Sequence, residues 1–350
     1  MASNREVSSR PNDTVEIFKD VQPEEVSTKV DGYSNFFTGE KSSVEKVECR
    51  RESAKEMTST YYDLVTDFYQ YGWGDSFHFC PVYNRRSFQQ CLVDHEYYLS
   101  EKLDLKAGMK VLDMGCGIGG PARNIARHSG AEIIGLNFNE YQIKKATKLT
   151  AEANLQHLIK YDKGDFNEAP YDDNSFDVVY AIEATCHSYS REKVYGEALR
   201  VLKPGGVFGV YEWAMTDKYD PNNLEHKQVK EGVEEGDSLP ELETITANLQ
   251  HMKNVGFDIV ECRDLVEISE IPWYKVLDGS SLRNFRMSSL GRFTTHAMIS
   301  ALELLHIAPA GSKKVHTLLC NAAESLVKAG KLEIFTPMLL FVARKPTSQE

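Results

Sequence analysis

The sequence predicts an α/β protein built on a doubly wound, mostly parallel seven-stranded sheet. Short apolar segments alternate with helical segments along the middle of the chain, and a glycine-rich turn follows the first apolar segment. Strands that alternate with helices form parallel sheets with right-handed crossover connections. Ligands of such sheets bind at the carboxyl ends of the strands, so we expect the functional site there.

Four segments have the apolar and β-branched composition of buried strands: 111–115, 133–137, 177–184 and 206–213. A less apolar segment, 158–165, and two later ones, 257–265 and 332–345, are also predicted as strands. Helices are predicted over 139–153 and 191–202, the second of which ends before a Lys-Pro-Gly-Gly stop. About sixty residues separate the last two strands, far more than an ordinary loop, and they predict a helical insertion with an apolar helix near 293–305.

The chain before the first strand divides into two parts. Residues 1–56 are polar and charged, and we expect a flexible N-terminal arm with one short helix. Residues 57–105 predict a helical cap, with helices over 57–69 and 87–103. A ligand-binding core over 106–265 and a C-terminal region over 266–350 complete the expected domain organisation.

Composition limits the class of partner. The chain of 350 residues has a net charge of −12, which argues against a nucleic acid because phosphates require a basic surface. Its seven cysteines have no metal-binding spacing, so we expect no metal and a reducing compartment. The N-terminus lacks the apolar core of a signal peptide, and no segment has the apolar length of a membrane span. We therefore expect any membrane contact to be peripheral.

The glycine turn matches two kinds of cofactor site. Gly115, Gly117 and Gly120 fit the GxGxxG pattern of dinucleotide-binding proteins. Asp113 stands just before the turn, where a carboxylate would repel a pyrophosphate. The second strand ends in Asn137, where a dinucleotide site needs an acidic residue for the ribose. These two departures disfavour a nicotinamide cofactor.

Carboxylates around the turn favour a cationic ligand. Asp165 and Glu183 are predicted at the carboxyl ends of the next two strands, around the same crevice as Asp113. S-adenosylmethionine carries a sulfonium and an ammonium group and no phosphate. One carboxylate about 4 Å from a cation contributes on the order of 4 kcal/mol at an effective dielectric constant near 20, before desolvation. The sequence therefore predicts S-adenosylmethionine as cofactor and S-adenosylhomocysteine as product.

Eight residues are predicted to bind this cofactor. We expect Asp113 to accept from its ammonium group and Asn137 to bond a ribose hydroxyl. Asp165 is expected at the adenine amino group, with Phe166 beside the ring. The full set is Asp113, Gly115, Cys116, Gly117, Asn137, Gln142, Asp165 and Phe166.

An unusual aromatic segment precedes the glycine turn. Residues 70–79 read QYGWGDSFHF, and two glycines interrupt the alternation of rings that a strand would need. The segment therefore predicts neither helix nor strand. Its four rings are Tyr71, Trp73, Phe77 and Phe79.

Several blocks of the sequence resemble those of the sterol 24-C-methyltransferase family. They are YGWGDSFHF, LDMGCGIGGPAR, YAIEATCH, YEWAMTDKYD, EIPWY and FTPMLLFVARKP, in the family's order over residues 57–346. The resemblance implies a class I methyltransferase fold, which is Rossmann-like, and methyl transfer to C24 of a Δ24-unsaturated sterol in sterol biosynthesis. Two positions depart from the family pattern. The family usually has Glu at Gln70, and it often has small residues or proline where this chain has Ser188-Tyr189 after His187.

The implied chemistry assigns a role to the aromatic segment. Methylation of an alkene leaves a carbocation, and an aromatic face is worth about 0.5–2 kcal/mol to a cation. We expect this cation and the sterol side chain to lie against Tyr71, Trp73, Phe77, Phe79 and Trp273. Tyr71 is expected to act in catalysis as well. The candidates for the final deprotonation are Glu183 and His187, with His78 and Asp75 from the aromatic segment.

Other functions stay open on the sequence alone. A small-molecule O- or N-methyltransferase of the same fold would use His187 as a general base. A nicotinamide-dependent dehydrogenase and a non-catalytic lipid-binding protein are the further alternatives. A homo-oligomer and peripheral contact with the cytoplasmic side of the endoplasmic reticulum, or with lipid droplets, are also compatible with the sequence.

Overall fold

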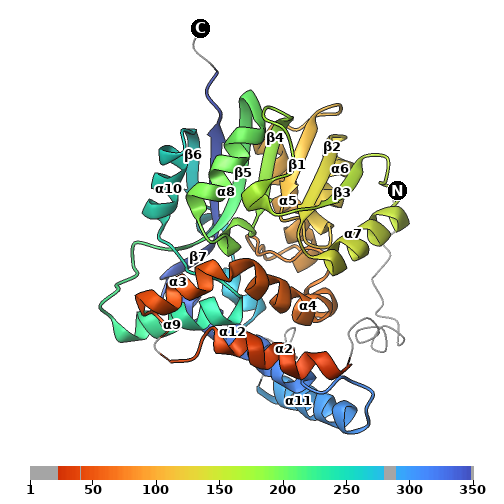
Figure 1. The fold of residues 1–350 in the computed structure, drawn as a ribbon, viewed down its shortest axis with the longest axis vertical. Coiled ribbons are helices and arrows are strands. Elements are labelled where there is room, and N and C mark those ends of the chain that lie inside the picture. Colours follow the sequence, from red (N-terminus) through yellow and green to blue (C-terminus); the bar gives the residue numbers. More distant parts are fainter. Residues whose placement is uncertain (1–22, 40, 280–288, 348–350) are drawn as a thin grey trace.

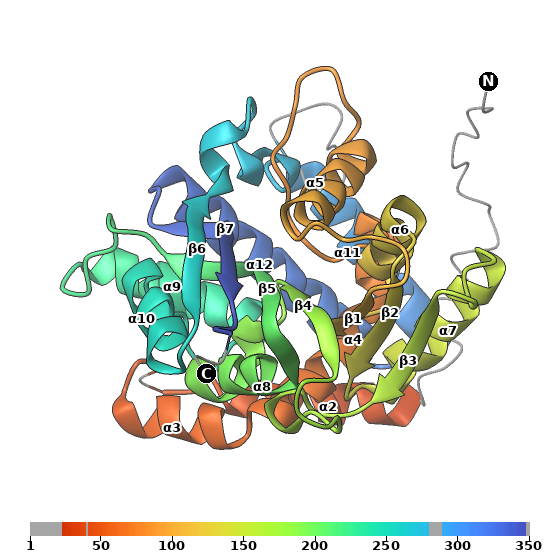
Figure 2. The same ribbon diagram turned by 90° about the horizontal axis from the view of Figure 1, so that it is seen from above.

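One seven-stranded sheet organises the part of the chain that the computed structural model describes, residues 23–347 without 40 and 280–288. The strand order is β3-β2-β1-β4-β5-β7-β6 (Figures 1 and 2). Strands β1 to β5 are parallel, and β7 runs antiparallel to both of its neighbours. The bounds are β1 (Lys110–Met114), β2 (Glu132–Asn137), β3 (Ile159–Lys163), β4 (Phe176–Ile182), β5 (Leu202–Met215), β6 (Asp258–Asp264) and β7 (Phe335–Arg344). The predicted fold class is confirmed.

Helices cover both faces of the sheet, which explains the apolar composition of its central strands. Val111 belongs to the core under α5 (Phe88–Lys102) and α6 (Gly120–Ser129). Its neighbour Leu112 points the other way, into the core under α8 (Arg191–Val201) and α10 (Ile245–Asn254). Helix α7 (Glu140–Glu152) packs against β2 and β3 at the edge of the sheet.

A layer of helices gathers beyond one end of the sheet (Figure 1). Its members contact one another in pairs, with α12 touching α2, α9 and α11, and α4 touching α2 and α3. They come from both ends of the sequence and from the segment after β5. Their bounds are α2 (Pro23–Asn35), α3 (Val44–Glu52), α4 (Ala54–Trp73), α9 (Leu224–Gly236), α11 (Ser289–Leu304) and α12 (Ser312–Lys331).

The structure differs from the expected N-terminal arm over residues 23–52. Helices α2 and α3 occupy this range, and four apolar side chains of α2 and the turn after it are buried against α4 and α12. They are Val26, Val30, Tyr33 and Phe37. The remainder of the expected arm, residues 1–22, lies outside the described residues. Residues 23–52 are thus a structural part of the helical layer.

Helix α4 is longer than predicted and contains the first four residues of the aromatic segment. It continues through Trp73 and ends at Gly74, whose φ of 106° is accessible to glycine at little cost. Tyr71 and Trp73 therefore point in directions set by helical geometry, whereas Phe77 and Phe79 lie in the irregular segment that follows.

The segment between β6 and β7 is the predicted helical insertion. It contains two short 3₁₀ helices, Leu265–Ile268 and Trp273–Val276, followed by α11 and α12. Residues 280–288 of the predicted C-terminal region lie outside the described residues. Within the described part of the chain, every helix is too short or too polar to span a lipid bilayer.

Candidate active site

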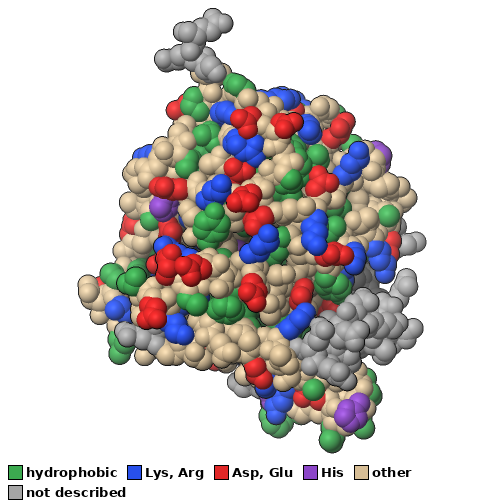
Figure 3. All heavy atoms as spheres, in the orientation of Figure 1, with side chains coloured by type: hydrophobic (Ala, Val, Ile, Leu, Met, Phe, Trp, Pro, Cys, Tyr) green, Lys and Arg blue, Asp and Glu red, His purple; other side chains and the backbone are tan. Residues whose placement is uncertain are grey.

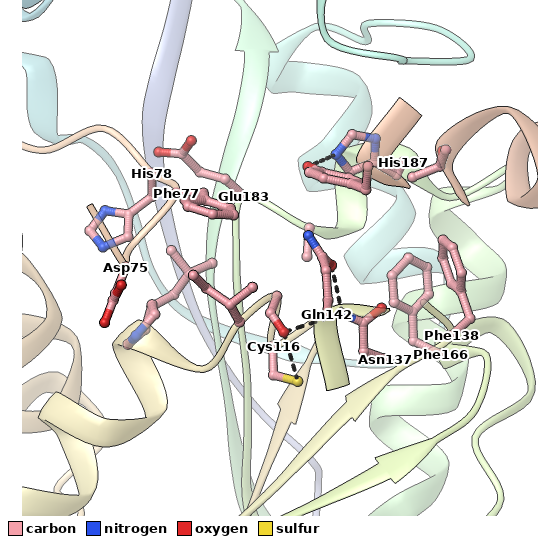
Figure 4. A pocket seen from close by; sticks show the side chains of 18 residues that line it. Asp75, Phe77, His78, Cys116, Asn137, Phe138, Gln142, Phe166, Glu183 and His187 are labelled. Carbon is pink, nitrogen blue, oxygen red and sulfur yellow. Dashed lines mark hydrogen bonds between the residues drawn. The ribbon is translucent and has the colours of Figure 1, made fainter. Parts of the chain in front are cut away.

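A cavity lies at the carboxyl ends of the parallel strands, where the sequence predicts the site. The segments that follow β1, β2, β3 and β4 form its floor, and α4 and residues 75–78 cover it (Figure 4). Its lining residues are Thr58, Tyr62, Asp75, Phe77, His78, Gly115, Cys116, Gly117, Ile118, Pro121, Asn137, Phe138, Gln142, Phe166, Ile182, Glu183, Ala184 and His187.

The glycine turn exposes backbone to this cavity. Gly115 and Gly117 have φ angles of 86° and 54°, a region that favours glycine. A Cβ on Gly115 would lie 2.4 Å from the Cβ of Ala184, so the turn packs closely against the segment after β4. No atom lies within 4 Å of the position a Cβ on Gly117 would take. The backbone at Gly117 therefore borders open space that a ligand can fill.

Amide side chains at the end of β2 form a second wall of the cavity. Asn137 donates from Nδ2 to Oε1 of Gln142 at 2.8 Å and accepts from the backbone N–H of Asn139 at 3.0 Å. Gln142 donates to the hydroxyl of Thr66 on α4 at 3.1 Å. Both amides are buried, so these bonds hold them in place and tie α4 to α7 and the end of β2.

Helix α4 presents polar groups to the cavity from above. Thr58 and Tyr62 are one turn apart on this helix and both line the cavity. The hydroxyl of Thr58 is buried and has no hydrogen-bond partner among the described residues. Buried polar groups are almost always paired, so this hydroxyl is available to a ligand in the cavity.

Glu183 lies directly after β4 and lines the cavity (Figure 4). Its φ of 50° is in the left-handed region, which is costly for a residue other than glycine and is found often at functional positions. One carboxylate oxygen accepts from the backbone N–H of Phe79 at 2.7 Å. Burial raises the pKa of Glu183 to about 8, although the charge of His78 and the Phe79 bond oppose the shift.

His187 lines the cavity with both ring nitrogens engaged. Nδ1 donates to the carbonyl of Ser238 at 3.1 Å, and Nε2 accepts from the hydroxyl of Tyr62 at 3.0 Å. Burial lowers the pKa of His187 to about 4. The imidazole is therefore a neutral group that orients Tyr62, and its basic lone pair is already in use.

His78 is held from both sides in a buried polar cluster. Nδ1 donates to the carbonyl of Phe79 at 2.7 Å, and Nε2 lies 3.0 Å from the carboxylate of Glu96. That carboxylate also accepts from Ser76 and Asn124, both at 2.6 Å. Burial alone lowers the pKa of His78, but the hydrogen bond to Glu96 and its charge outweigh burial and raise it. Both ring nitrogens of His78 are therefore engaged by neighbouring protein groups.

The aromatic segment divides into one ring at the cavity and others in the core. Phe77 lines the cavity, and its ring meets Tyr69 edge to face with centroids 5.5 Å apart. Phe79 packs against Trp73, Trp213 and Trp273, with centroids 5.1, 5.9 and 5.0 Å away. The prediction placed four rings of this segment, and Trp273, around one ligand. The structure brings only Phe77 of these five to the cavity.

Tyr71 lies elsewhere, on the last turn of α4. Its side chain is 47% exposed, and it is absent from the residues that line the cavity. The prediction that Tyr71 contacts the substrate relied on a non-helical segment 70–79. Helix α4 instead continues to Trp73, so Tyr71 lies on the helix and Phe77 lies after its end.

Two carboxylates that the sequence predicts to bind the cofactor, those of Asp113 and Asp165, do not line the cavity and interact with other protein groups. Asp113 is buried beneath the glycine turn and accepts from the hydroxyl of Tyr180 at 3.0 Å, while burial raises its pKa to about 7. Asp165 caps a 3₁₀ helix (Phe166–Glu168) through the N–H of Asn167 and lies 3.2 Å from the ammonium of Lys55. Both carboxylates support the walls of the site. The other six predicted cofactor residues line the cavity.

Comparisons with known proteins agree on one enzyme class. A family model described as methyltransferase domain matches residues 112–210, and one described as sterol methyltransferase C-terminal matches residues 282–347. A cycloartenol-C-24-methyltransferase of Oryza sativa subsp. japonica is 46% identical over 94% of this chain and 95% of its own. A sterol 24-C-methyltransferase of Saccharomyces cerevisiae is 49% identical over 87% of this chain and 82% of its own.

Solved structures of other methyltransferase-fold proteins share the architecture. A cyclopropane synthase of Mycobacterium tuberculosis superposes with a TM-score of 0.65 at 17% identity, over 84% of this chain and 98% of the other. A geranyl diphosphate C-methyltransferase of Streptomyces coelicolor, solved with S-adenosylhomocysteine, gives a TM-score of 0.59 at 14% identity, over 83% and 97%. At sequence identities this low, the structural similarity supports the assignment of the fold alone.

Proposed function

The chain belongs to the sterol 24-C-methyltransferase family, and from this premise we propose which of its residues hold the cofactor and carry out the reaction. The enzyme is an S-adenosylmethionine-dependent methyltransferase of sterol biosynthesis that acts at C24 of a sterol side chain. The proposed residue roles rest on the residues that line the cavity. This cavity brings together a glycine turn, the ring of Phe77 and the carboxyl group of Glu183.

The cofactor is proposed to lie along the glycine turn. Gly117 borders open space, and the hydroxyl of Thr58 is unpaired, so the cavity offers both room and a free donor for an amino-acid moiety. Asn137 stands where class I folds of this topology meet a ribose, and Phe166 supplies an apolar wall for an adenine ring. Bound here, S-adenosylmethionine supplies an electrophilic methyl group.

Phe77 and Glu183 are proposed to serve the sterol. The alkene needs no base to act as a nucleophile, and its methylation leaves positive charge on the side chain. The face of Phe77 stabilises that charge without reacting with it. The Glu183 carboxylate accepts the proton whose loss regenerates a neutral alkene. Both ring nitrogens of His78 and of His187 already have hydrogen-bond partners in the protein, so neither residue takes this role in the proposal.

The same geometry disfavours a small-molecule O- or N-methyltransferase. Such an enzyme would need His187 to remove a proton from a hydroxyl or an amine. The lone pair on Nε2 of His187 already accepts a hydrogen bond from the hydroxyl of Tyr62, and burial lowers the pKa of the ring to about 4.

Incubation with methyl-labelled S-adenosylmethionine tests the assignment of substrate. We expect label to enter Δ24-unsaturated sterols, and we expect none in the matched sterols with a saturated side chain, because only an alkene is nucleophilic. Mass spectrometry of the extracted products checks this result. Labelling of phenols or amines with no labelling of any sterol would refute the assignment.

A second prediction concerns the aromatic ring at the cavity. Phe77→Leu is expected to lower kcat about 3- to 30-fold while changing the KM for sterol less, since a cation–π contact of about 0.5–2 kcal/mol forms only as charge develops. Tyr71→Leu is the matched control, because this ring lies on the exposed end of α4, and its kcat should stay near the wild-type value. Steady-state kinetics of both variants give kcat and the KM for sterol and so test this prediction. Equal losses of kcat in the Phe77 and Tyr71 variants would show that the ring of Phe77 has no particular role in stabilising the cation.

A further inference from the structure

Helix α11 and the turn after it carry a concentration of exposed apolar side chains. Of the ten large hydrophobic residues exposed in the described part of the chain, five lie within 293–307. They are Phe293, Met298, Leu304, Leu305 and Ile307. The other five are scattered singly over different elements, which is normal for a protein surface. A concentrated apolar surface marks an interaction site.

The exposed residues form a stripe along one side of the helix. Phe293, Ala297, Ala301 and Leu304 recur at intervals of three to four residues and are all exposed. Ile299 is buried instead, and α11 packs against α12. In Figure 1 the helix lies at the lower end of the molecule, and Figure 3 shows hydrophobic side chains there. The stripe therefore faces away from the protein.

This surface is almost free of charge. Between residues 293 and 312 the sequence has one charged side chain, Glu303, in a chain of which 26% is charged. One oxygen of Glu303 accepts from the N–H groups of Gly311 and Lys313 at 3.0 and 2.8 Å, so this carboxylate is bound at the start of α12. Lys313 and Lys314 follow at the end of the stripe and are exposed. An uncharged stripe with lysines at its border is typical of helices that lie in the interface of a lipid bilayer.

We propose that the stripe on α11 docks the enzyme on a zwitterionic phospholipid surface, from which the sterol is taken. The proposal rests on the sterol methyltransferase function, whose substrate is dissolved in lipid. A net charge of −12 opposes recruitment by anionic lipid, so binding depends on apolar contact and is insensitive to salt. A second copy of the chain is the competing occupant of the stripe.

Flotation of the full chain with phosphatidylcholine vesicles tests the proposal. Leu304→Asp combined with Leu305→Asp should reduce the vesicle-bound fraction at least tenfold, because both side chains are exposed, at 81% and 65%, and neither supports the fold. Leu224→Asp combined with Val260→Asp is the matched control, since these residues are exposed at 69% and 61% on α9 and β6. The control should bind vesicles as the wild type does. Phe293→Ser combined with Met298→Ser provides a milder variant of the same stripe.

Activity measurements separate docking from catalysis. The Leu304/Leu305 variant should methylate sterol carried by cyclodextrin at the wild-type rate, and sterol embedded in vesicles at least tenfold more slowly. Absence of sterol methylation by the wild type in both assays would overturn the function, whereas the vesicle-binding result would still stand. Equal vesicle binding by the stripe and control variants would overturn the proposal. Conversion of a dimer to a monomer by the stripe variants, with vesicle binding unchanged, would assign the stripe to a second copy.

Discussion

Glu183→Gln is expected to lower kcat by about two to four orders of magnitude, the usual contribution of a general base. Glutamine keeps the size of the side chain and can still accept the 2.7 Å hydrogen bond from the N–H of Phe79. It cannot take a proton from the sterol cation. The affinity for S-adenosylhomocysteine should change less than tenfold, because the glycine turn and the amide wall are untouched. Rapid-quench kinetics and calorimetric titration measure the two quantities.

The pH dependence of the wild type gives an independent signature of the same group. Burial raises the pKa of Glu183 to about 8, so in the free enzyme the carboxyl is mostly protonated below that pH and cannot act as a base. We expect kcat/KM to rise with pH through about 8 and then level off. A bound sulfonium favours the ionised carboxylate, so the corresponding limb of kcat should lie at lower pH.

The glutamine variant should lose this acidic limb in both profiles. An unchanged limb would show that another group controls the rate, and a large loss of cofactor affinity would show that Glu183 mainly serves the cofactor. His187→Asn is a useful comparison, because it removes the contact to Tyr62 without changing a group that titrates near pH 8.

The seven predicted segments overlap the observed strands in every case. The central strands β1, β2 and β4 are mostly buried, and strands buried on both faces have continuous apolar sequences, whereas β3 and β6 at the edges of the sheet are partly exposed. The carboxyl edge of the sheet, and with it the glycine turn, Asn137 and Glu183, follows from the strand assignment. The position of these groups at the edge of the sheet could therefore be predicted from the local sequence of the strands.

The sequence predicts a flexible arm with one short helix where the structure has α2 and α3, because these helices are stabilised by contacts with distant parts of the chain. In α2 and the turn after it, Val26, Val30, Tyr33 and Phe37 recur at helical intervals, but the residues between them are polar and the average composition resembles that of an arm. Such a short helix is marginal in isolation. It is held by burial of these four side chains against α4 and α12, elements that are distant in the sequence.

The sequence of α4 contains a spacing of polar residues that predicts its contribution to the cavity, although the average composition of the segment does not show it. Thr58, Tyr62 and Thr66 recur every four residues and form a polar stripe next to the apolar face of the helix. Thr58 and Tyr62 line the cavity, and Thr66 binds Gln142. The same helix continues through Gly72 to Trp73, so Tyr71 lies on α4 and Phe77 lies after its end.

The second large effect is expected for Gly120→Ala. A Cβ on Gly120, at the start of α6, would lie 2.1 Å from the carbonyl oxygen of Asp75 and 2.6 Å from the hydroxyl of Ser76. Atoms of the main chain cannot yield at that distance, so the 75–76 turn must move. Asp75 is also fixed by Arg123, 2.9 Å from its carboxylate. The third glycine of the motif thus serves the close approach of the aromatic segment to α6.

The displacement should disturb catalysis more than cofactor binding. Phe77 follows the 75–76 turn directly, and the N–H of Phe79 in the same segment donates to Glu183, so both groups would shift. A misplacement of about 1 Å can cost roughly 100-fold in rate. Overpacking of this kind also destabilises by about 1–3 kcal/mol. We therefore expect kcat to fall about 100-fold and the melting temperature to fall by several degrees, as measured by steady-state kinetics and calorimetry.

Gly196→Ala is the matched control for this substitution. Gly196 lies inside α8, and the nearest atom to a methyl group added there would be Cγ1 of Val255 at 3.9 Å, an ordinary contact. Alanine is the better helix former, so this variant should be stabilised by about 0.4–1 kcal/mol and keep its activity. If Gly120→Ala behaved like Gly196→Ala, the tight contact between α6 and the 75–76 turn would not control the position of Phe77. A loss of rate restricted to Gly120→Ala would assign that role to the third glycine of the turn.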